Sequence, residues 1–150
     1  MKKVFASFAV SLGLLMGFIP QVQADATVKN AMVSLKDELN KLGEPSLKGS
    51  DLYFGSNKIN GDYTVVDAIK QKHSGTATVF VKDGSNFIRI STNVMKAGQR
   101  AVGTPLDPSG PAKAAIDAGN AFYGPVDILG KIYQTGYEPI VDAQGNTVGI

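Results

Sequence analysis

The sequence has no cysteine among its 150 residues. Disulfide bonds, thiol chemistry and cysteine-based metal sites are therefore excluded, even in an oxidising compartment. The only histidine, His73, cannot form a metal or catalytic site by itself. We predict a protein without metal, cofactor or catalytic residues, and an exported enzyme is the least supported alternative because no nucleophile and base stand out.

The chain also has no large excess of positive or negative charge. The formal net charge of +2 comes from the two lysines near the start of the chain, and without them thirteen basic residues face thirteen acidic ones. A neutral domain lacks the basic surface that nucleic-acid binding requires. Seventeen glycines and the absence of tryptophan indicate a compact domain that is rich in turns.

Long hydrophobic runs are absent except at the N-terminus. Lys2 and Lys3 precede an uncharged run at residues 4–19, and Val22 and Ala24 are small residues at the positions that a signal peptidase reads. This layout predicts a signal peptide at residues 1–24 and one mature domain at residues 25–150, either periplasmic or secreted. The alternative is an uncleaved inner-membrane anchor facing the periplasm, although a span needs roughly 20 apolar residues.

Apolar periodicity predicts helices first and strands afterwards. A three- and four-residue spacing predicts a helix over residues 27–42 that ends at Gly43, and Asp62 can cap a second helix that ends at Ser74-Gly75. Residues 47–61 are predicted to be a loop with one small strand. Residues 93–108 are expected to form a long connection to a short helix at residues 112–118.

The remaining segments have the two-residue alternation of strands. Residues 76–82 and 87–92 form a predicted hairpin around the turn Asp83-Gly84-Ser85-Asn86. Val79-Phe80-Val81 is apolar on both faces, which predicts a central strand. Strands at residues 121–129 and 131–141 follow, and a fifth begins at residue 147. This order predicts an α+β domain with an antiparallel sheet.

Several blocks of residues in these segments resemble the sequences of a known protein family. TATVFVKDGSNFIRISTNV occupies residues 76–94, RAVGTPLD residues 100–107, DILGK residues 127–131 and YEPI residues 137–140, with Tyr123-Gly124 and Tyr133 among them. In this order they resemble the single Cache sensor domains (the Cache 3/Cache 2 fusion type) of methyl-accepting chemotaxis receptors and sensor kinases. The resemblance covers about residues 62–150.

The resemblance implies a PAS-like fold in which a long N-terminal helix packs on a five-stranded antiparallel sheet. It also implies an extracytoplasmic sensor in signal transduction or chemotaxis, which holds a small organic acid or similar metabolite without transforming it. A receptor of this family would keep its N-terminal anchor and complete the last strand beyond Ile150. We therefore expect a free-standing sensor that works with a membrane receptor or kinase. A truncated chemoreceptor, or a structural protein with this fold and no ligand, is the alternative.

Candidate ligand-binding residues come from strand alternation. Arg89 shares a strand face with Phe87 and Ser91, whereas Tyr133 and Tyr137 share a face of a later strand. A guanidinium binds a carboxylate through two hydrogen bonds, and tyrosine hydroxyls add directional ones. We predict Arg89 as the anion anchor of a site lined by Tyr123, Tyr133 and Tyr137, with Arg100 as a second choice. The alternative is structural: strand tyrosines often pack half-buried, and a strand arginine often pairs across the sheet.

Overall fold

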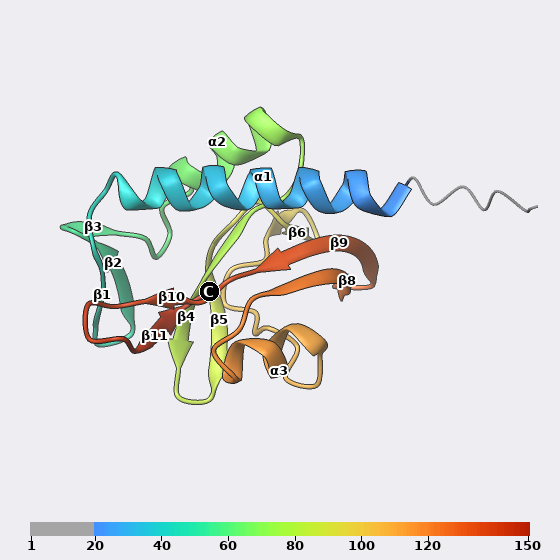
Figure 1. Cartoon of the computed structure of the whole chain (residues 1–150). Coiled ribbons are helices and arrows are strands. Elements are labelled where there is room, and N and C mark those ends of the chain that lie inside the picture. The colour runs from blue at the N-terminus through green and yellow to red at the C-terminus, as the bar shows by residue number, and fades with distance from the viewer. Residues whose placement is uncertain (1–19) are drawn as a thin grey trace, which may run out of the picture.

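The structure, a computed structural model, describes residues 20–150, with side chains from residue 26 onward. Most of the predicted signal peptide lies outside this range, so both the peptide and its cleavage stay predictions. The described chain is an α+β domain in which one long helix lies across antiparallel strands (Figure 1). The predicted fold class is therefore confirmed.

Helix α1 (Pro20–Asn40) contains most of the predicted first helix and begins earlier. Proline is tolerated in the first turn of a helix, because the first N–H groups have no intrahelical partner. One side of α1 faces the sheet, where Leu39 is buried and Leu35 is half-buried, whereas Val33 on the other side is 57% exposed. The helix therefore contributes a single apolar stripe to the core, as its periodicity predicts.

Helix α2 (Thr64–His73) forms where it was predicted, but its N-cap position is Tyr63 and not Asp62. The Asp62 carboxylate accepts a hydrogen bond of 2.9 Å from the Thr64 N–H at its start. Ser74 adopts a left-handed conformation at its end, with φ at 58°. The buried side chains Val66 and Ile69 pack against the core.

The main sheet has the strand order β10-β11-β4-β5 and is antiparallel. Its strands are β4 (Thr78–Asp83), β5 (Asn86–Thr92), β10 (Ile140–Val141) and β11 (Thr147–Gly149). Strand β4 is central, as Val79-Phe80-Val81 predicts: Val79 and Val81 belong to one core cluster and Phe80 to another. Both faces of β4 are therefore covered.

The predicted five-stranded sheet is wrong in detail. The described residues place four strands in the main sheet, while β8 (Phe122–Ile128) and β9 (Lys131–Tyr137) form a separate two-stranded sheet. Glu138 and Pro139 divide the predicted single strand 131–141 into β9 and β10, because proline has no N–H to donate to a neighbouring strand. A loop instead covers the outer edge of β5. The Arg89 N–H of β5 donates a hydrogen bond of 3.0 Å to the Thr104 carbonyl oxygen of this loop.

Two segments that were predicted as loops contain short strands. Strands β1 (Pro45–Lys48), β2 (Asp51–Phe54) and β3 (Asn57–Lys58) form a three-stranded sheet, so one small strand was an underestimate. Gly49 and Gly55 have positive φ and make the turns between them. Strands β6 (Met95–Lys96) and β7 (Gln99–Arg100) form a hairpin within the predicted long connection. The short helix α3 (Pro111–Asp117) follows that connection.

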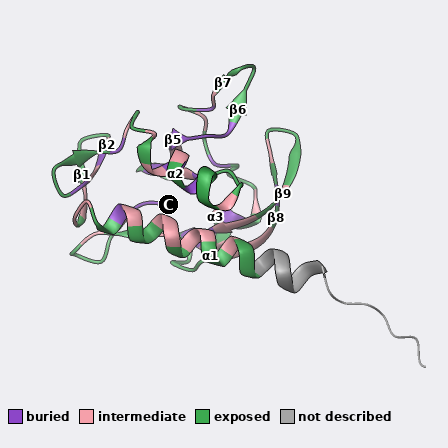
Figure 2. Ribbon diagram, turned by 90° about the horizontal axis from the view of Figure 1, so that it is seen from above, coloured by how far each residue is buried: buried purple, intermediate pink, exposed green. Residues whose placement is uncertain are grey.

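Two clusters of buried apolar side chains hold these elements together. The buried stretches of the chain are purple in the ribbon of Figure 2. The first lies between α1, α2 and one face of the sheet, and includes Leu39, Val66, Ile69, Val79, Val81 and Ile90. The second lies on the other face beneath α3 and β8, and includes Phe80, Phe87, Ile116, Val126, Tyr137 and Ile150. Within residues 20–150, no helix has the length and apolar character that a membrane span requires.

Candidate ligand-binding site

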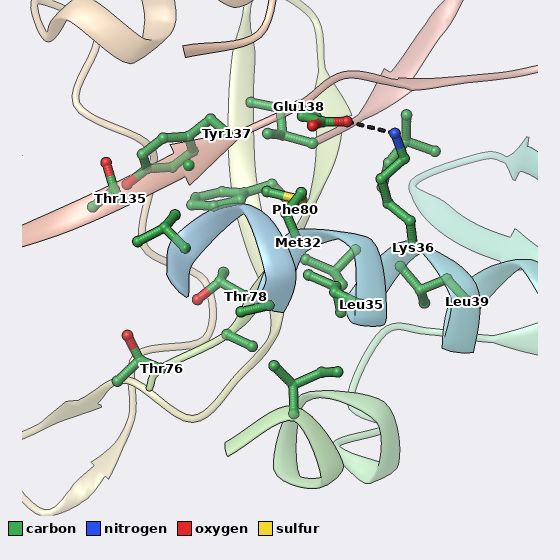
Figure 3. Close-up of a pocket in the computed structure, with 18 of the residues that line it drawn as sticks. Met32, Leu35, Lys36, Leu39, Thr76, Thr78, Phe80, Thr135, Tyr137 and Glu138 are labelled. Carbon is green, nitrogen blue, oxygen red and sulfur yellow. Dashed lines mark hydrogen bonds and ion pairs between the residues drawn. The ribbon is translucent and has the colours of Figure 1, made fainter. Parts of the chain in front are cut away.

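A cavity of about 400 Å³ lies beneath α1 (Figure 3). Its walls come from the inner side of α1, from the first half of β4 and from the end of β9. The residues that form these walls include Met32, Leu35, Leu39, Thr76, Thr78, Phe80, Arg89, Thr135, Tyr137 and Glu138. Both core clusters contribute, since Leu39 belongs to the first and Phe80 to the second. The cavity therefore reaches from one face of the sheet to the other.

Arg89 is the buried cation in this wall, and only 4% of its surface is exposed. Its Nη1 donates to Thr104 Oγ1 at 2.8 Å and to Pro105 O at 3.1 Å, and its guanidinium carbon lies 4.9 Å from the centre of the Phe80 ring. Among residues 26–150 no carboxylate forms an ion pair with it, and its buried Nε has no hydrogen-bond partner there. Burial lowers the pKa of Arg89, which reflects the cost of holding this charge away from water.

Tyr137 lies on the same side of the sheet as Arg89. Its ring packs against Phe80 and Phe122, with ring centres 6.4 Å apart in each pair. Burial raises the pKa of the Tyr137 hydroxyl, although the nearby Arg89 cation acts in the opposite direction. The hydroxyl is therefore a neutral donor at physiological pH. Figure 3 shows the Tyr137 and Phe80 rings side by side in the cavity wall, next to Met32 of α1.

The four predicted site residues do not all reach the cavity. Arg89, Tyr133 and Tyr137 line it, whereas Tyr123 is outside the lining. The Tyr123 hydroxyl donates to Glu138 Oε1 at 2.5 Å, and Lys36 Nζ of α1 donates to Glu138 Oε2 at 2.5 Å. Burial raises the pKa of Glu138, but these two hydrogen bonds outweigh it and leave the pKa lowered. The charged Glu138 thus connects α1 to β9 at the edge of the cavity.

Arg100, the second-choice anchor, is engaged elsewhere. Its two terminal nitrogens each lie 2.8 Å from an oxygen of Asp67, and Nη1 also donates to Thr92 O at 2.9 Å. The Tyr63 ring lies beneath its guanidinium, 4.2 Å from ring centre to carbon. Arg100 does not line the cavity. Its charge is already matched by a carboxylate, unlike that of Arg89.

The sequence did not predict every residue of the cavity or every detail of its strands. In β5, for example, Phe80 pairs with Arg89 while Val79 pairs with Ser91. Ile90 is therefore an extra residue in a bulge, which interrupts the strand alternation. Thr78, Met32 and Glu138 also border the cavity. The apolar stripe of α1 was a signal for Met32, but only as a core residue. No local pattern distinguishes a wall of the cavity from the packed core.

A comparison with protein families identifies the domain. A family model described as single Cache domain 3 matches residues 57–150. The chain belongs to the single Cache domain family. Cache domains are extracytoplasmic sensor domains that bind small molecules in signalling, generally without catalysis. No curated protein and no solved structure matches the chain. The Cache match includes Arg89 and the three tyrosines but not α1, which supplies one wall of the cavity.

Proposed function

We propose that this Cache domain is an exported sensor that binds a small carboxylate in the cavity beneath α1. The single observation that carries this proposal is Arg89, a buried cation in the cavity wall that no carboxylate of the described chain neutralises. Buried charges in proteins are normally paired, because an isolated charge is costly to remove from water. An anionic ligand in the cavity would supply the missing partner for this charge.

The rest of the cavity suits a ligand with an apolar body. Met32, Leu35 and Phe80 provide apolar contact, while the hydroxyls of Tyr133 and Tyr137 offer hydrogen bonds. A few polar groups in a mainly apolar wall are typical of small-molecule sites, and the cavity volume falls within their usual range. Tyr123 would act indirectly by holding Glu138 in place.

The binding event would be reported through α1. This helix forms the roof of the cavity and is connected to β9 by the Lys36–Glu138 ion pair. A ligand that changes the packing beneath the helix would shift its position. We propose a membrane receptor or kinase in a signalling or chemotaxis pathway as the partner that detects this shift. The N-terminal segment supports export, and N-terminal sequencing of the protein from the periplasm would show whether it is cleaved after Ala24.

A thermal-shift screen tests the ligand proposal. The protein, purified from the extracytoplasmic fraction, is heated with small carboxylates and with the corresponding uncharged amides. A carboxylate present at about 100 times its dissociation constant should stabilise the fold by about 2.7 kcal/mol, and its amide should not. If no carboxylate raises the melting temperature, the sensing proposal fails and a structural role with the same fold remains.

A pair of variants tests the location. Ala31 lines the cavity, so Ala31→Leu should fill part of it and weaken carboxylate binding roughly tenfold, the effect of about 1.4 kcal/mol. Val33→Leu is the matched control, because Val33 is on the same helix but is exposed on its outer side. Equal affinities for both variants would place the ligand outside this cavity.

A further inference from the structure

The turn between β8 and β9 exposes apolar side chains to solvent. Leu129 is 45% exposed, and Ile132 is 67% exposed, the highest value among the large apolar side chains of residues 26–150. In Figure 2 the ribbon of this turn has the colour of exposed residues. Residues 129–132, which we call the hairpin tip, do not line the cavity beneath α1. The hairpin tip is therefore a surface separate from the candidate ligand site.

The backbone of Leu129 has a conformation that does not suit leucine. Leu129 and Gly130 connect the two strands, and their φ angles are 55° and 85°. Two-residue hairpin turns with positive φ at both positions favour Asn-Gly or Asp-Gly, because other side chains are strained there. The Asp127 carboxylate stabilises this turn by accepting a hydrogen bond of 2.6 Å from the Gly130 N–H. An exposed leucine adds little to the core in return for its strain, which points to a role outside the fold.

The hairpin tip lies at the end of the molecule where α1 begins. Lys36 pairs with Glu138, and one step nearer the tip Val28 lies against Gly136, so α1 and β9 run toward this end together. Figures 1 and 2 show the β8–β9 turn and the start of α1 at the same end. The uncharged run at residues 4–19 precedes α1 in the sequence. Both predictions for this run, a signal peptide or an anchor, place it in the membrane.

The side chains of the hairpin tip suit a lipid surface. Leu129 and Ile132 are aliphatic, Lys131 is a cation between them, and the half-buried Tyr133 follows. Aliphatic side chains enter the acyl region of a membrane, while lysine and tyrosine lie at the level of the headgroups. Lys131 Nζ lies 5.8 Å from the centre of the Tyr133 ring, and no carboxylate among residues 26–150 forms an ion pair with it. A stable protein partner would need about 800 Å² of surface on each side, far more than these few side chains offer.

We propose that the hairpin tip inserts into a phospholipid surface, with Leu129 and Ile132 among the acyl chains and Lys131 beside a lipid phosphate. This proposal goes beyond the proposed function and does not depend on the ligand cavity. The Asp127 carboxylate offsets the charge of Lys131, so zwitterionic phospholipids suffice for the contact. The contact would direct the start of α1 toward the membrane, where a receptor or kinase partner would lie.

Tryptophan fluorescence tests this contact, because the chain has no tryptophan of its own. Ile132→Trp introduces a reporter in the hairpin tip, at a strand position that accepts an aromatic residue. Val141→Trp is the matched control, since Val141 is 43% exposed in β10, away from this end of the molecule (Figure 1). The protein from the extracytoplasmic fraction is titrated with phosphatidylcholine vesicles whose acyl chains are brominated. The emission of Ile132→Trp should shift to shorter wavelength and be quenched, whereas that of Val141→Trp should not change. A retained anchor would tether both variants equally, so the difference still reports on the hairpin tip.

A second substitution, Leu129→Asn in the Ile132→Trp background, separates lipid binding from folding. Asparagine suits a positive φ, so the melting temperature should rise. The lipid concentration at half-maximal quenching should increase roughly tenfold, because an aliphatic side chain no longer enters the membrane. Val141→Asn in the same background is the control and should leave this concentration unchanged.

Three results would overturn the inference, and none of them affects the proposed carboxylate binding. The first is equal quenching of the two reporters, or none of Ile132→Trp. The second is an unchanged lipid concentration at half-maximal quenching with Leu129→Asn. The third is a shift of the Ile132→Trp emission with a membrane-free extracytoplasmic extract but not with vesicles, which would indicate a protein partner.

Discussion

The two halves of strand β4 have different surroundings. The half from Phe80 to Asp83 lies between β5 and β11, and at Gly149 an added methyl group would come within 2.3 Å of the Phe80 carbonyl oxygen. At the start of the strand, Thr78 and Val79 line the cavity. The same strand is therefore tightly packed at one end and borders the cavity at the other. We propose that one end maintains the fold while the other contacts the ligand.

Alanine substitution of one glycine near each end tests this contrast most directly. Gly149→Ala should lower the free energy of unfolding by about 3 kcal/mol, because backbone atoms of β4 would have to move. Gly75→Ala should change it by less than about 0.5 kcal/mol, since Gly75 lines the cavity and the nearest atom to an added methyl is 4.0 Å away. Urea denaturation measures both values, and equal losses would show that the two ends are packed alike.

The two buried or half-buried arginines provide a second contrast. Arg89→Met should weaken carboxylate binding roughly a hundredfold, the effect of two charge-assisted hydrogen bonds at about 1.5 kcal/mol each. The melting temperature without ligand should stay the same or rise, because an unpaired buried charge is replaced by an apolar side chain. Arg100→Met is the matched control and should leave binding unchanged, as Arg100 pairs with Asp67 outside the cavity. Retained binding in Arg89→Met would remove this residue from the site.

The smallest expected effect concerns the Asp67–Arg100 pair. The hydrogen bond from Arg100 lowers the pKa of Asp67, so the folded state binds this proton less tightly than the unfolded chain does. The pair should therefore stabilise the fold above the ordinary aspartate pKa of about 3.9, and lose this contribution as the pH falls through the lowered folded value. Asp67→Asn should melt slightly earlier than the parent at pH 7, and the difference should disappear in strong acid. A constant difference across the pH range would point to packing instead.

The sequence predictions were accurate where a structural element depends on residues close to one another in the sequence. The two helices, the hairpin at Gly84 and the central position of Val79-Phe80-Val81 follow from periodicity and turn residues, which act over a few positions. The strands β8 and β9 were predicted, but their separation from the main sheet was missed, because each looks like a strand of that sheet when its sequence is read alone. Arg89, Tyr133 and Tyr137 line the same cavity, whereas Tyr123 does not, and residue type alone did not separate Tyr123 from the other two tyrosines.

The sequence by itself determined the class of the domain, its membership of the Cache family and the absence of cysteine chemistry, since each depends on residue identity and order. Only the tertiary structure decided which arginine has no carboxylate partner. Arg100 meets Asp67, a residue 33 positions away, and Arg89 meets no carboxylate within the described chain. It also decided where the cavity lies, because its walls come from α1, the start of β4 and the end of β9, which are far apart in the sequence. Such features arise from contacts between distant segments, which local sequence patterns do not encode.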